Sequence, residues 1–333
     1  MQTIFAFFYS IFGFLFRILY SFIDNYGLAL LIFTLFFRLI IMPTNIKQQK
    51  SSATQVRMQP KLKRIREKYQ DFPPQERNQK IQEETNELYQ REGYSAMAGS
   101  CLPLLFQLPI LWGLYGVVRE PLKYVLETPS ELLTALTNVA KTSLNLSQRG
   151  LAYIETSLIS NIDKLVVKIP ETAAKYPLEI QKIREFDFTV FGIDLGAVPD
   201  FATLKNLGSS TTQAKILLLI PLLSFLTSMM TSVLTQLRQK KNNPNMENAQ
   251  MMGCMMFTMP LMSLWFTFQF PAAMGMYWIL SNIFAFFQTL LLGHIYAPRK
   301  TIARMMVDET IYRRSYEQTK KQLSADAVQT DPA

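Results

Sequence analysis

The residue most able to do chemistry in this sequence is Arg38, which lies inside the apolar stretch from Asn25 to Pro43. A helix of about 20 apolar residues suffices to cross a lipid bilayer, and this stretch reaches that length. A charged side chain near the middle of such a helix costs roughly 2.5–3.5 kcal/mol on insertion scales. Because a helix rises ~1.5 Å per residue, we expect Arg38 to lie ~8 Å from the Pro43 end.

Two interpretations of Arg38 follow from this depth. Its guanidinium can extend along the helix to the headgroups of the inner leaflet, as long basic side chains do. Alternatively, it faces a hydrated cavity inside the protein and attracts an anionic group. No Asp or Glu lies in any of the five spans expected below, so no carboxylate within the membrane is expected to neutralise Arg38.

Five apolar stretches are long enough to be membrane spans that could position such a site. We expect them at residues 25–45, 98–119, 213–237, 251–270 and 271–293. Residues 1–24 are also apolar, but their polar side chains recur on one helical face, which predicts an amphipathic helix in the membrane interface. A signal peptide is the alternative, weakened by the absence of a basic residue before the apolar run and of a small-residue cleavage pattern after it.

Polar residues also share a face within the expected spans. Ser and Thr in such helices often bond to their own backbone or join neighbouring helices. Gln and Asn side chains are harder to explain in this way, and if the polar faces converge they enclose a hydrophilic cavity. The polar residues in question are Thr34, Arg38, Gln107, Ser224, Ser228, Thr231, Thr235, Ser263, Thr267, Tyr277, Ser281, Asn282 and Gln288.

The segments between the spans differ in charge. The first part of residues 46–97 is strongly basic and carries a narrow apolar stripe that ends at Tyr69. The sequence Asp71-Phe-Pro-Pro74 then interrupts the helical pattern. A second polar helix follows and ends at Gly93. This pattern predicts a helical hairpin, with an ordinary charged loop as the alternative. Residues 120–212 balance acids and bases, with helical periodicity at 130–140 and 151–167 and a β-like run at 186–193.

The charge of these segments predicts the topology. Loops rich in Lys and Arg remain in the cytoplasm. The hairpin at 46–97, the loop at 238–250 and the tail at 294–333 are basic and fall on one side of five spans. The segment at 120–212, called the external segment below, falls on the other side. We therefore expect a multi-pass protein of the cell (plasma) membrane with its N-terminus outside and its C-terminus in the cytoplasm.

Composition supports the same class of protein. The chain has 333 residues, of which 49% are hydrophobic, and a formal net charge of +9. A basic excess can indicate nucleic acid binding, but here the apolar residues form long blocks, which indicates an all-α membrane protein with basic loops. The sequence contains no Gly-rich phosphate loop, nucleophile elbow or metal-ligand spacing. We therefore expect neither an enzyme nor a cofactor.

Several motifs together resemble the YidC-type membrane protein insertases, the family that includes the mitochondrial Oxa and chloroplast Alb proteins. They are Asn25-Tyr-Gly27, Thr34-x-x-x-Arg38, Pro43, Gln59-Pro-Lys-Leu-Lys-x-Ile-x-Glu-Lys-Tyr69, residues 99–110, Phe270-Pro271, Met276-Tyr277-Trp278 and Ser281-Asn282. The sequence departs from the family pattern at Ser100, which is an extra residue, and at Ala273, where the family usually has Gly. We expect no counterpart of the large periplasmic domain of Gram-negative members, so the chain resembles a Gram-positive-type member.

The resemblance implies that the protein inserts newly made membrane proteins and acts as a chaperone in their folding. Nascent membrane proteins and lipids are then its partners, and the ribosome and the Sec translocon are further partners that it implies. A secondary transporter or channel with an anion pathway at Arg38 is the alternative, although five spans divide badly into the repeats that transporters show. The family pattern and the polar faces place these residues in a substrate-binding groove: Arg38, Thr34, Gln107, Leu108, Tyr277, Trp278, Ser281, Asn282 and Gln288.

Overall fold

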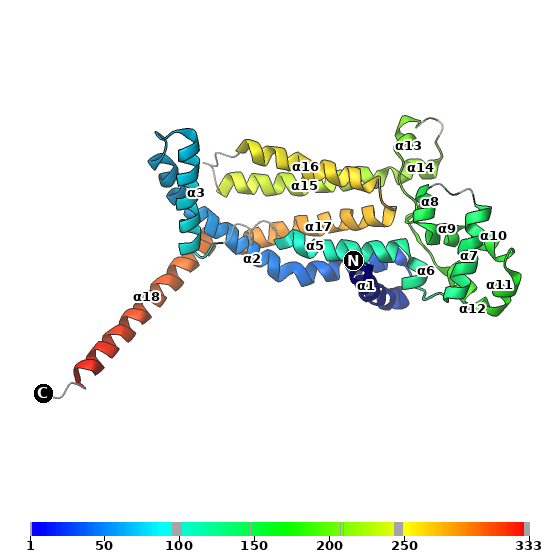
Figure 1. Cartoon of the computed structure of the whole chain (residues 1–333), viewed down its shortest axis with the longest axis horizontal. Helices are drawn as coiled ribbons and strands as arrows, with labels where there is room; N and C mark the ends of the chain where they lie inside the picture. The colour runs from blue at the N-terminus through cyan, green and yellow to red at the C-terminus, as the bar shows by residue number, and fades with distance from the viewer. Residues whose placement is uncertain are drawn as a thin grey trace. The chain divides into compact units, whose positions relative to one another are not determined.

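The computed structural model describes residues 2–94, 102–144, 146, 148–206, 208, 210–242 and 249–329. These residues are mostly helical (Figure 1). They belong to two compact units. The first unit takes its residues from 1–42, 103–239 and 245–288, and the second from 43–102, 240–244 and 289–333. The helix α2 (Tyr26–Lys68) begins in the first unit and ends in the second.

The first unit contains the long apolar helices. By length and composition, the described helices that could cross a membrane lie at Ala6–Ile23, Tyr26–Lys68, Thr212–Lys241 and Ala272–Ile295. This architecture fits the expected all-α membrane protein. The start of the span expected at 98–119 lies outside the described residues. Besides α2, the long helices of this unit are α1 (Gln2–Ile23), α5 (Leu102–Arg119), α15 (Leu219–Asn242), α16 (Ala249–Thr267) and α17 (Ala272–Ile295).

The helical region expected at 213–237 is divided. The short helix α14 (Thr212–Leu217) ends just before α15 begins at Leu219. Pro221 has no backbone N–H to donate to the carbonyl of Leu217, so one bond of a continuous helix cannot form. The side chain of Thr211 accepts a hydrogen bond of 3.3 Å from the Ala214 N–H and thereby caps the start of α14.

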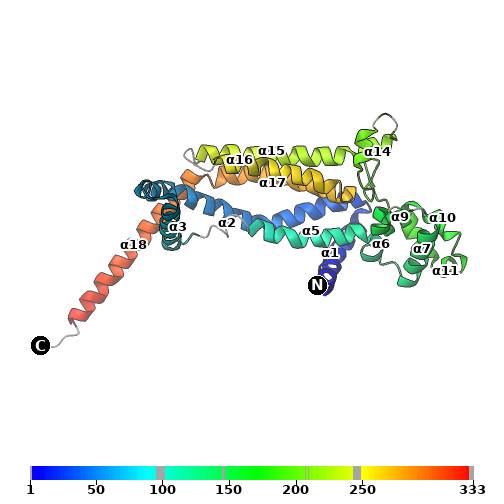
Figure 2. The same ribbon diagram turned by 45° about the horizontal axis from the view of Figure 1, so that its top comes forward.

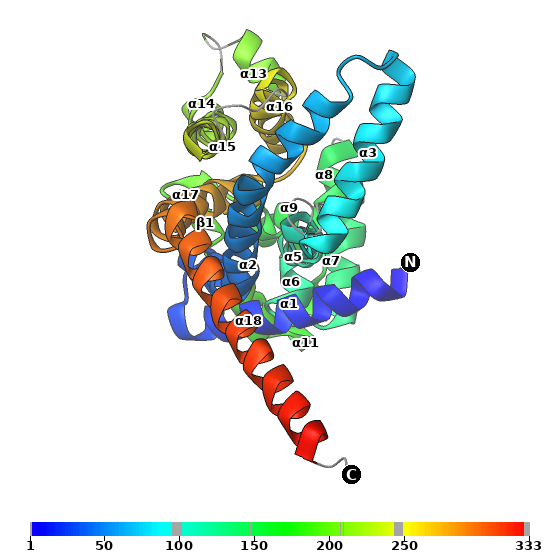
Figure 3. The same cartoon turned by 90° about the vertical axis from the view of Figure 1, so that its left-hand side faces the viewer.

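Aromatic rings form the core where α1 meets α2. Phe16 lies 4.5 Å from the ring of Tyr26 and 5.6 Å from that of Phe33, and Phe12 stacks on Phe37 at 4.9 Å. Within the first unit, α1 crosses the long axes of α2 and α5, since it is seen nearly end-on in Figure 1 and side-on in Figure 3. Its placement in the membrane interface stays a prediction, because its length and composition also suit a span.

The external segment folds into short helices beyond one end of the long helices of the first unit (Figures 1 and 2). Their own core is apolar and includes the buried side chains of Leu132, Leu136, Leu158 and Leu165. The helices are α6 (Pro121–Tyr124), α7 (Ser130–Ser143), α8 (Gln148–Ala152), α9 (Ile154–Ser160), α10 (Ile162–Val166), α11 (Pro170–Lys175), α12 (Pro177–Glu185) and α13 (Phe201–Lys205).

The periodicity of this segment predicts its elements only in part. The helical pattern at 130–140 corresponds to α7, but the pattern at 151–167 is divided among α8, α9 and α10 by breaks at Tyr153 and Asn161. The β-like run at 186–193 contains the two-residue strand β1 (Thr189–Val190) and the first residue of β2 (Ile193–Asp194), and the two strands pair antiparallel. Thr189 lies opposite Asp194, and Val190 lies opposite Ile193.

The second unit contains the remainder of α2 with α3 (Pro74–Arg91) and α18 (Pro298–Gln329). The sequence predicts that the Arg38 span ends at Pro43, but the helix itself continues through Pro43 and Pro60 to Lys68. Met58 and Leu62 of α2 are buried against Leu88 of α3. The backbone of Gly93, with φ +61°, ends the α3 region in a conformation that glycine adopts at little cost.

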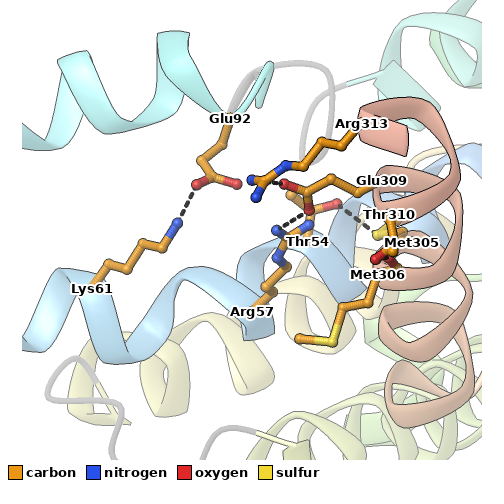
Figure 4. Close-up of polar contacts among 9 residues, drawn as sticks. All are labelled: Thr54, Arg57, Lys61, Glu92, Met305, Met306, Glu309, Thr310 and Arg313. Carbon is orange, nitrogen blue, oxygen red and sulfur yellow. Dashed lines mark hydrogen bonds and ion pairs between the residues drawn. The ribbon is translucent and has the colours of Figure 1, made fainter. Parts of the chain in front are cut away.

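Ion pairs add to this apolar contact. Lys61 pairs with Glu92, and Lys68 pairs with Glu84. In the same unit, Arg57 of α2 donates to a carboxylate oxygen of Glu309 in α18 at 2.8 Å, and Arg313 donates to the second oxygen at 2.7 Å (Figure 4). Arg57 lowers the pKa of the Glu309 carboxyl. Residues 298–329, expected only as part of a basic tail, therefore form a helix that is attached to α2.

Candidate functional site

Arg38 of α2 contacts α17 through a neutral partner. Its Nε donates to the hydroxyl of Ser281 at 3.0 Å, and its Nη2 donates to the same oxygen. Ser281 is buried and Arg38 is half-buried. Among the described residues, Arg38 forms no ion pair with a carboxylate. A serine hydroxyl orients the guanidinium but leaves its positive charge uncompensated.

A second polar contact lies next to the first. Nε2 of Gln107 in α5 donates to the hydroxyl oxygen of Tyr277 in α17 at 2.7 Å. Tyr277 lies one helical turn before Ser281, and its side chain is close enough to Arg38 and Ser281 to interact with both. Side chains from α2, α5 and α17 thus form one polar cluster. We call Arg38, Gln107, Tyr277 and Ser281 the Arg38 cluster.

Other residues expected at the site have different surroundings. Thr34 is only 1% exposed, and its hydroxyl donates to the carbonyl of Leu30 in its own helix at 2.7 Å. The amide of Asn282 donates to the Thr227 hydroxyl of α15 at 3.4 Å. The ring of Trp278 lies 5.9 Å from Phe266 and 6.1 Å from Phe270, at the aromatic contact of α17 with the end of α16. Leu108 and Gln288 are half-buried.

The hydroxyls of α15 and α16 mostly join helices or bond to their own backbone. The hydroxyls of Ser224 and Ser263 lie 2.7 Å apart and connect α15 to α16. Thr231 and Thr235 each donate to the carbonyl four residues earlier. Ser and Thr in membrane helices often bond to their own backbone or join neighbouring helices, and these contacts are of that kind. The Arg38 cluster, in contrast, contains a charge that no carboxylate of the described residues neutralises.

Comparison with known proteins identifies the family. Residues 18–299 match the family model described as 60Kd inner membrane protein. This chain belongs to that family. It is 30% identical to the membrane protein insertase YidC of Oceanobacillus iheyensis, over 81% of this chain and 75% of that protein. It is 26% identical to the insertase MisCA of Bacillus subtilis, over 81% of this chain and 70% of that protein.

The comparisons confirm the resemblance to YidC-type insertases, and the relatives carry the names of insertases and not of enzymes. Together with the apolar helices, they make this member of the 60Kd inner membrane protein family a multi-pass membrane protein. Among the described residues, no group of three or more His, Cys, Asp or Glu side chains is placed to hold a metal ion.

The outer faces of the long helices suit a lipid environment. Large apolar side chains of α15 that would be costly to expose to water include Leu222, Leu226 and Leu237, and Leu261 and Trp265 of α16 are also exposed. An exposed apolar surface of this extent indicates a membrane or a partner, and in this family the bilayer accounts for it.

One buried acid, Glu155 in α9, is not among the candidate residues that the sequence pattern marks. Its carboxylate accepts hydrogen bonds from the N–H groups of Leu122 at 2.8 Å and Lys123 at 3.2 Å, and the residue is only 5% exposed. Burial raises the pKa of Glu155 to about 7, although the two backbone donors oppose this shift. A lone acid in a polar segment gives no periodic signal, so spacing could not single it out.

Proposed function

We propose that this chain inserts newly made membrane proteins into the cell (plasma) membrane and assists their folding. The family and the names of the relatives support the general function. The single observation that supports a specific mechanism is that Arg38 is bonded to Ser281, a neutral residue, so its charge is available to an incoming anionic group.

In this proposal, the Arg38 cluster lines a hydrophilic groove that opens to the cytoplasm and to lipid. An acidic group in the polar tail of a substrate is attracted by Arg38, and the attraction is strong because the surroundings have a low dielectric constant. The flanking apolar helix of the substrate then moves into lipid, and the burial of its apolar surface drives the step. The protein forms no covalent bond; it lowers the cost of moving a polar tail into the membrane.

The proposed topology has five spans, with the N-terminus outside and the C-terminus in the cytoplasm. It assigns α1 to the interface of the outer leaflet. This assignment is supported by the ion pair between Arg17 of α1 and Glu127 of the external segment. It is also supported by Gly13 of α1, where any side chain would overlap Tyr124 of α6. Both contacts keep α1 next to residues that the topology places outside.

Partners beyond substrates and lipids are also proposals. The basic α18 carries Arg299, Lys300, Arg304, Arg313 and Arg314, which suit ribosomal RNA, and the Sec translocon is a further candidate. Deletion of residues 300–333 should weaken ribosome co-sedimentation, and rising salt should weaken it further in the intact protein. Ribosome binding that is independent of salt and survives the deletion would rule out the tail as the ribosome-binding segment.

Insertion into proteoliposomes tests the function. Liposomes that contain the protein should insert a single-span substrate with an acidic N-terminal tail. The insertion yield should be several times that of empty liposomes. A photo-crosslinker at Gln107, in the Arg38 cluster, should capture the substrate tail, whereas a crosslinker at Leu178 of the external segment should not. Equal insertion by empty liposomes would contradict the proposal, and flux of small anions through the protein would favour the transporter alternative.

A further inference from the structure

The tip of the β-hairpin carries an unusual residue. Phe191 and Gly192 connect β1 to β2, and both have positive φ, +52° and +75°. A two-residue loop of this kind favours Asn-Gly or Asp-Gly, because a bulky side chain at positive φ is strained. Phe191 is nevertheless 94% exposed, the largest value among the exposed large hydrophobic residues of the described chain. The fold thus holds an aromatic ring at the tip without covering it.

Packing fixes where this tip lies along the helices. Val190 lies directly on Gly27 in the first turn of α2, so that a Cβ on Gly27 would overlap its Cγ2. Ile193, on the other strand, packs against a buried cluster made of Ile220 near the start of α15 and Ala272 and Ile279 of α17. The hairpin therefore lies where α2, α15 and α17 begin, which is the level at which their apolar stretches enter the membrane.

The chain that flanks the hairpin is fixed at the same level. The N–H groups of Ala272 and Ala273 at the start of α17 donate to the carbonyls of Ala197 at 2.8 Å and Leu195 at 2.9 Å. On the other flank, the ring of Phe188 lies 4.4 Å from that of Tyr26. Since backbone bonds and ring contacts hold both sides of the hairpin, its tip cannot move far from this level.

Exposed apolar side chains continue nearby on α1. Phe186, next to the hairpin, contacts Tyr20 near the end of α1 with 5.1 Å between ring centroids. On α1 itself, Phe14, Ile18 and Phe22 are exposed and recur every four residues. A face of this kind suits the boundary between headgroups and acyl chains.

We propose that Phe191 anchors the external segment in the interface of the outer leaflet. Phe side chains of interfacial segments bury in the boundary between headgroups and acyl chains, which removes their apolar surface from water. Val190 faces Gly27, whereas the ring of Phe191, in the loop that follows, is uncovered by the rest of the described chain. The assignment to the outer leaflet rests on the proposed topology, but contact of Phe191 with lipid does not depend on insertase activity.

An environment-sensitive fluorophore tests the anchor. Cys101 and Cys254 are replaced by Ser, and the fluorophore NBD is attached to a single cysteine in Phe191→Cys or in Val167→Cys. Val167 is a matched control, because it is also an apolar residue of the external segment and is 78% exposed. In phosphatidylcholine–phosphatidylglycerol vesicles, NBD at position 191 should emit at shorter wavelength and be quenched by 5-doxyl lipid. NBD at position 167 should be quenched by aqueous iodide and not by the lipid.

A second variant keeps an aromatic ring at the tip. Phe191→Trp should add fluorescence that brominated lipid quenches beyond the background of the wild-type protein, and Val167→Trp should add none that does so. The proposal would be overturned if iodide quenched NBD at position 191 as strongly as NBD at position 167. It would also be overturned if brominated lipid did not quench the fluorescence that Phe191→Trp adds. Insertion by the same proteoliposomes is measured in parallel, so a failure of the anchor is distinguished from a failure of the proposed function.

Discussion

Nε of Arg38 donates to the hydroxyl of Ser281 at 3.0 Å, and this bond connects α2 to α17 across 243 positions of the sequence. A carboxylate at position 281 would neutralise the guanidinium, whereas a serine orients it and leaves the charge. The Gln107–Tyr277 bond lies beside it and brings α5 into the same cluster. The proposed function depends on this combination of a fixed position and an uncompensated charge.

Removal of the Ser281 hydroxyl should weaken the site without removing its charge. A hydrogen bond to a charged group contributes about 1.5–3 kcal/mol, part of which water restores, so we expect Ser281→Ala to lower insertion of an acidic-tail substrate roughly five-fold. The measurement is insertion yield in proteoliposomes. Because Ser281 is proposed to act by positioning Arg38, the same substitution should have no further effect in an Arg38→Ala background; an equal loss there would show that Ser281 acts by another route.

The contact between Gly27 and Val190 should tolerate no side chain. In a helix, Gly→Ala ordinarily stabilises by up to about 1 kcal/mol, but here the new Cβ would overlap Val190. We expect Gly27→Ala to destabilise the protein by about 1–3 kcal/mol, seen as a lower Tm in detergent. Val190→Ala in the same chain removes the overlapping Cγ2 and should restore much of the loss. A double variant no more stable than Gly27→Ala would refute the proposed overlap.

Glu155 should make the external segment less stable as pH rises. The folded protein has a pKa of about 7 at Glu155, above the ordinary value of 4.5, so between these values the folded state binds more protons than the unfolded state. Stability should therefore fall between about pH 4.5 and pH 7, by at most about 3 kcal/mol. Thermal unfolding measured across pH checks this, and Glu155→Gln should flatten the dependence. An identical pH profile for both proteins would contradict it.

Leu88 should hold α3 against α2 in the second unit. It is buried with Met58 and Leu62, and truncation of a buried Leu typically costs about 2–5 kcal/mol. Since this core is small, we expect Leu88→Ala to release α3 and to speed limited proteolysis between residues 70 and 91. The neighbouring exposed Glu87→Ala is the control and should be cleaved like the wild type. Equal protection of both variants would mean that the ion pairs alone hold α3.

The sequence marks each residue of the Arg38 cluster, but it does not indicate which of these residues bond to one another. Arg38 was conspicuous because a charge in an apolar stretch is costly, and Gln107, Tyr277 and Ser281 were marked by the motifs. Which side chain bonds to which depends on how helices far apart in the sequence pack, and periodicity within one helix carries no such information. Thr34 stays a predicted groove residue, and its hydroxyl donates to the carbonyl of Leu30 in its own helix.

The outlines of the helices were predictable where apolar runs are long, and less so where proline or short elements intervene. α2 continues through Pro43, because a long helix tolerates the loss of one backbone bond. Pro221, in contrast, coincides with the division between α14 and α15. The external segment is built from helices too short to show a full apolar face, so its fold depends on the shared core and not on local pattern.

The charge at position 38 is most directly tested by combining variants of the protein with variants of the substrate. Arg38→Ala and the charge-retaining Arg38→Lys are reconstituted, and insertion is measured for one substrate with either an acidic or a neutral N-terminal tail. We predict that Arg38→Ala lowers insertion of the acidic-tail substrate roughly ten-fold, equivalent to about 1.4 kcal/mol, and leaves the neutral-tail substrate nearly unchanged, while Arg38→Lys retains most of the yield. Unchanged insertion by Arg38→Ala, or an equal loss for both tails, would contradict the account.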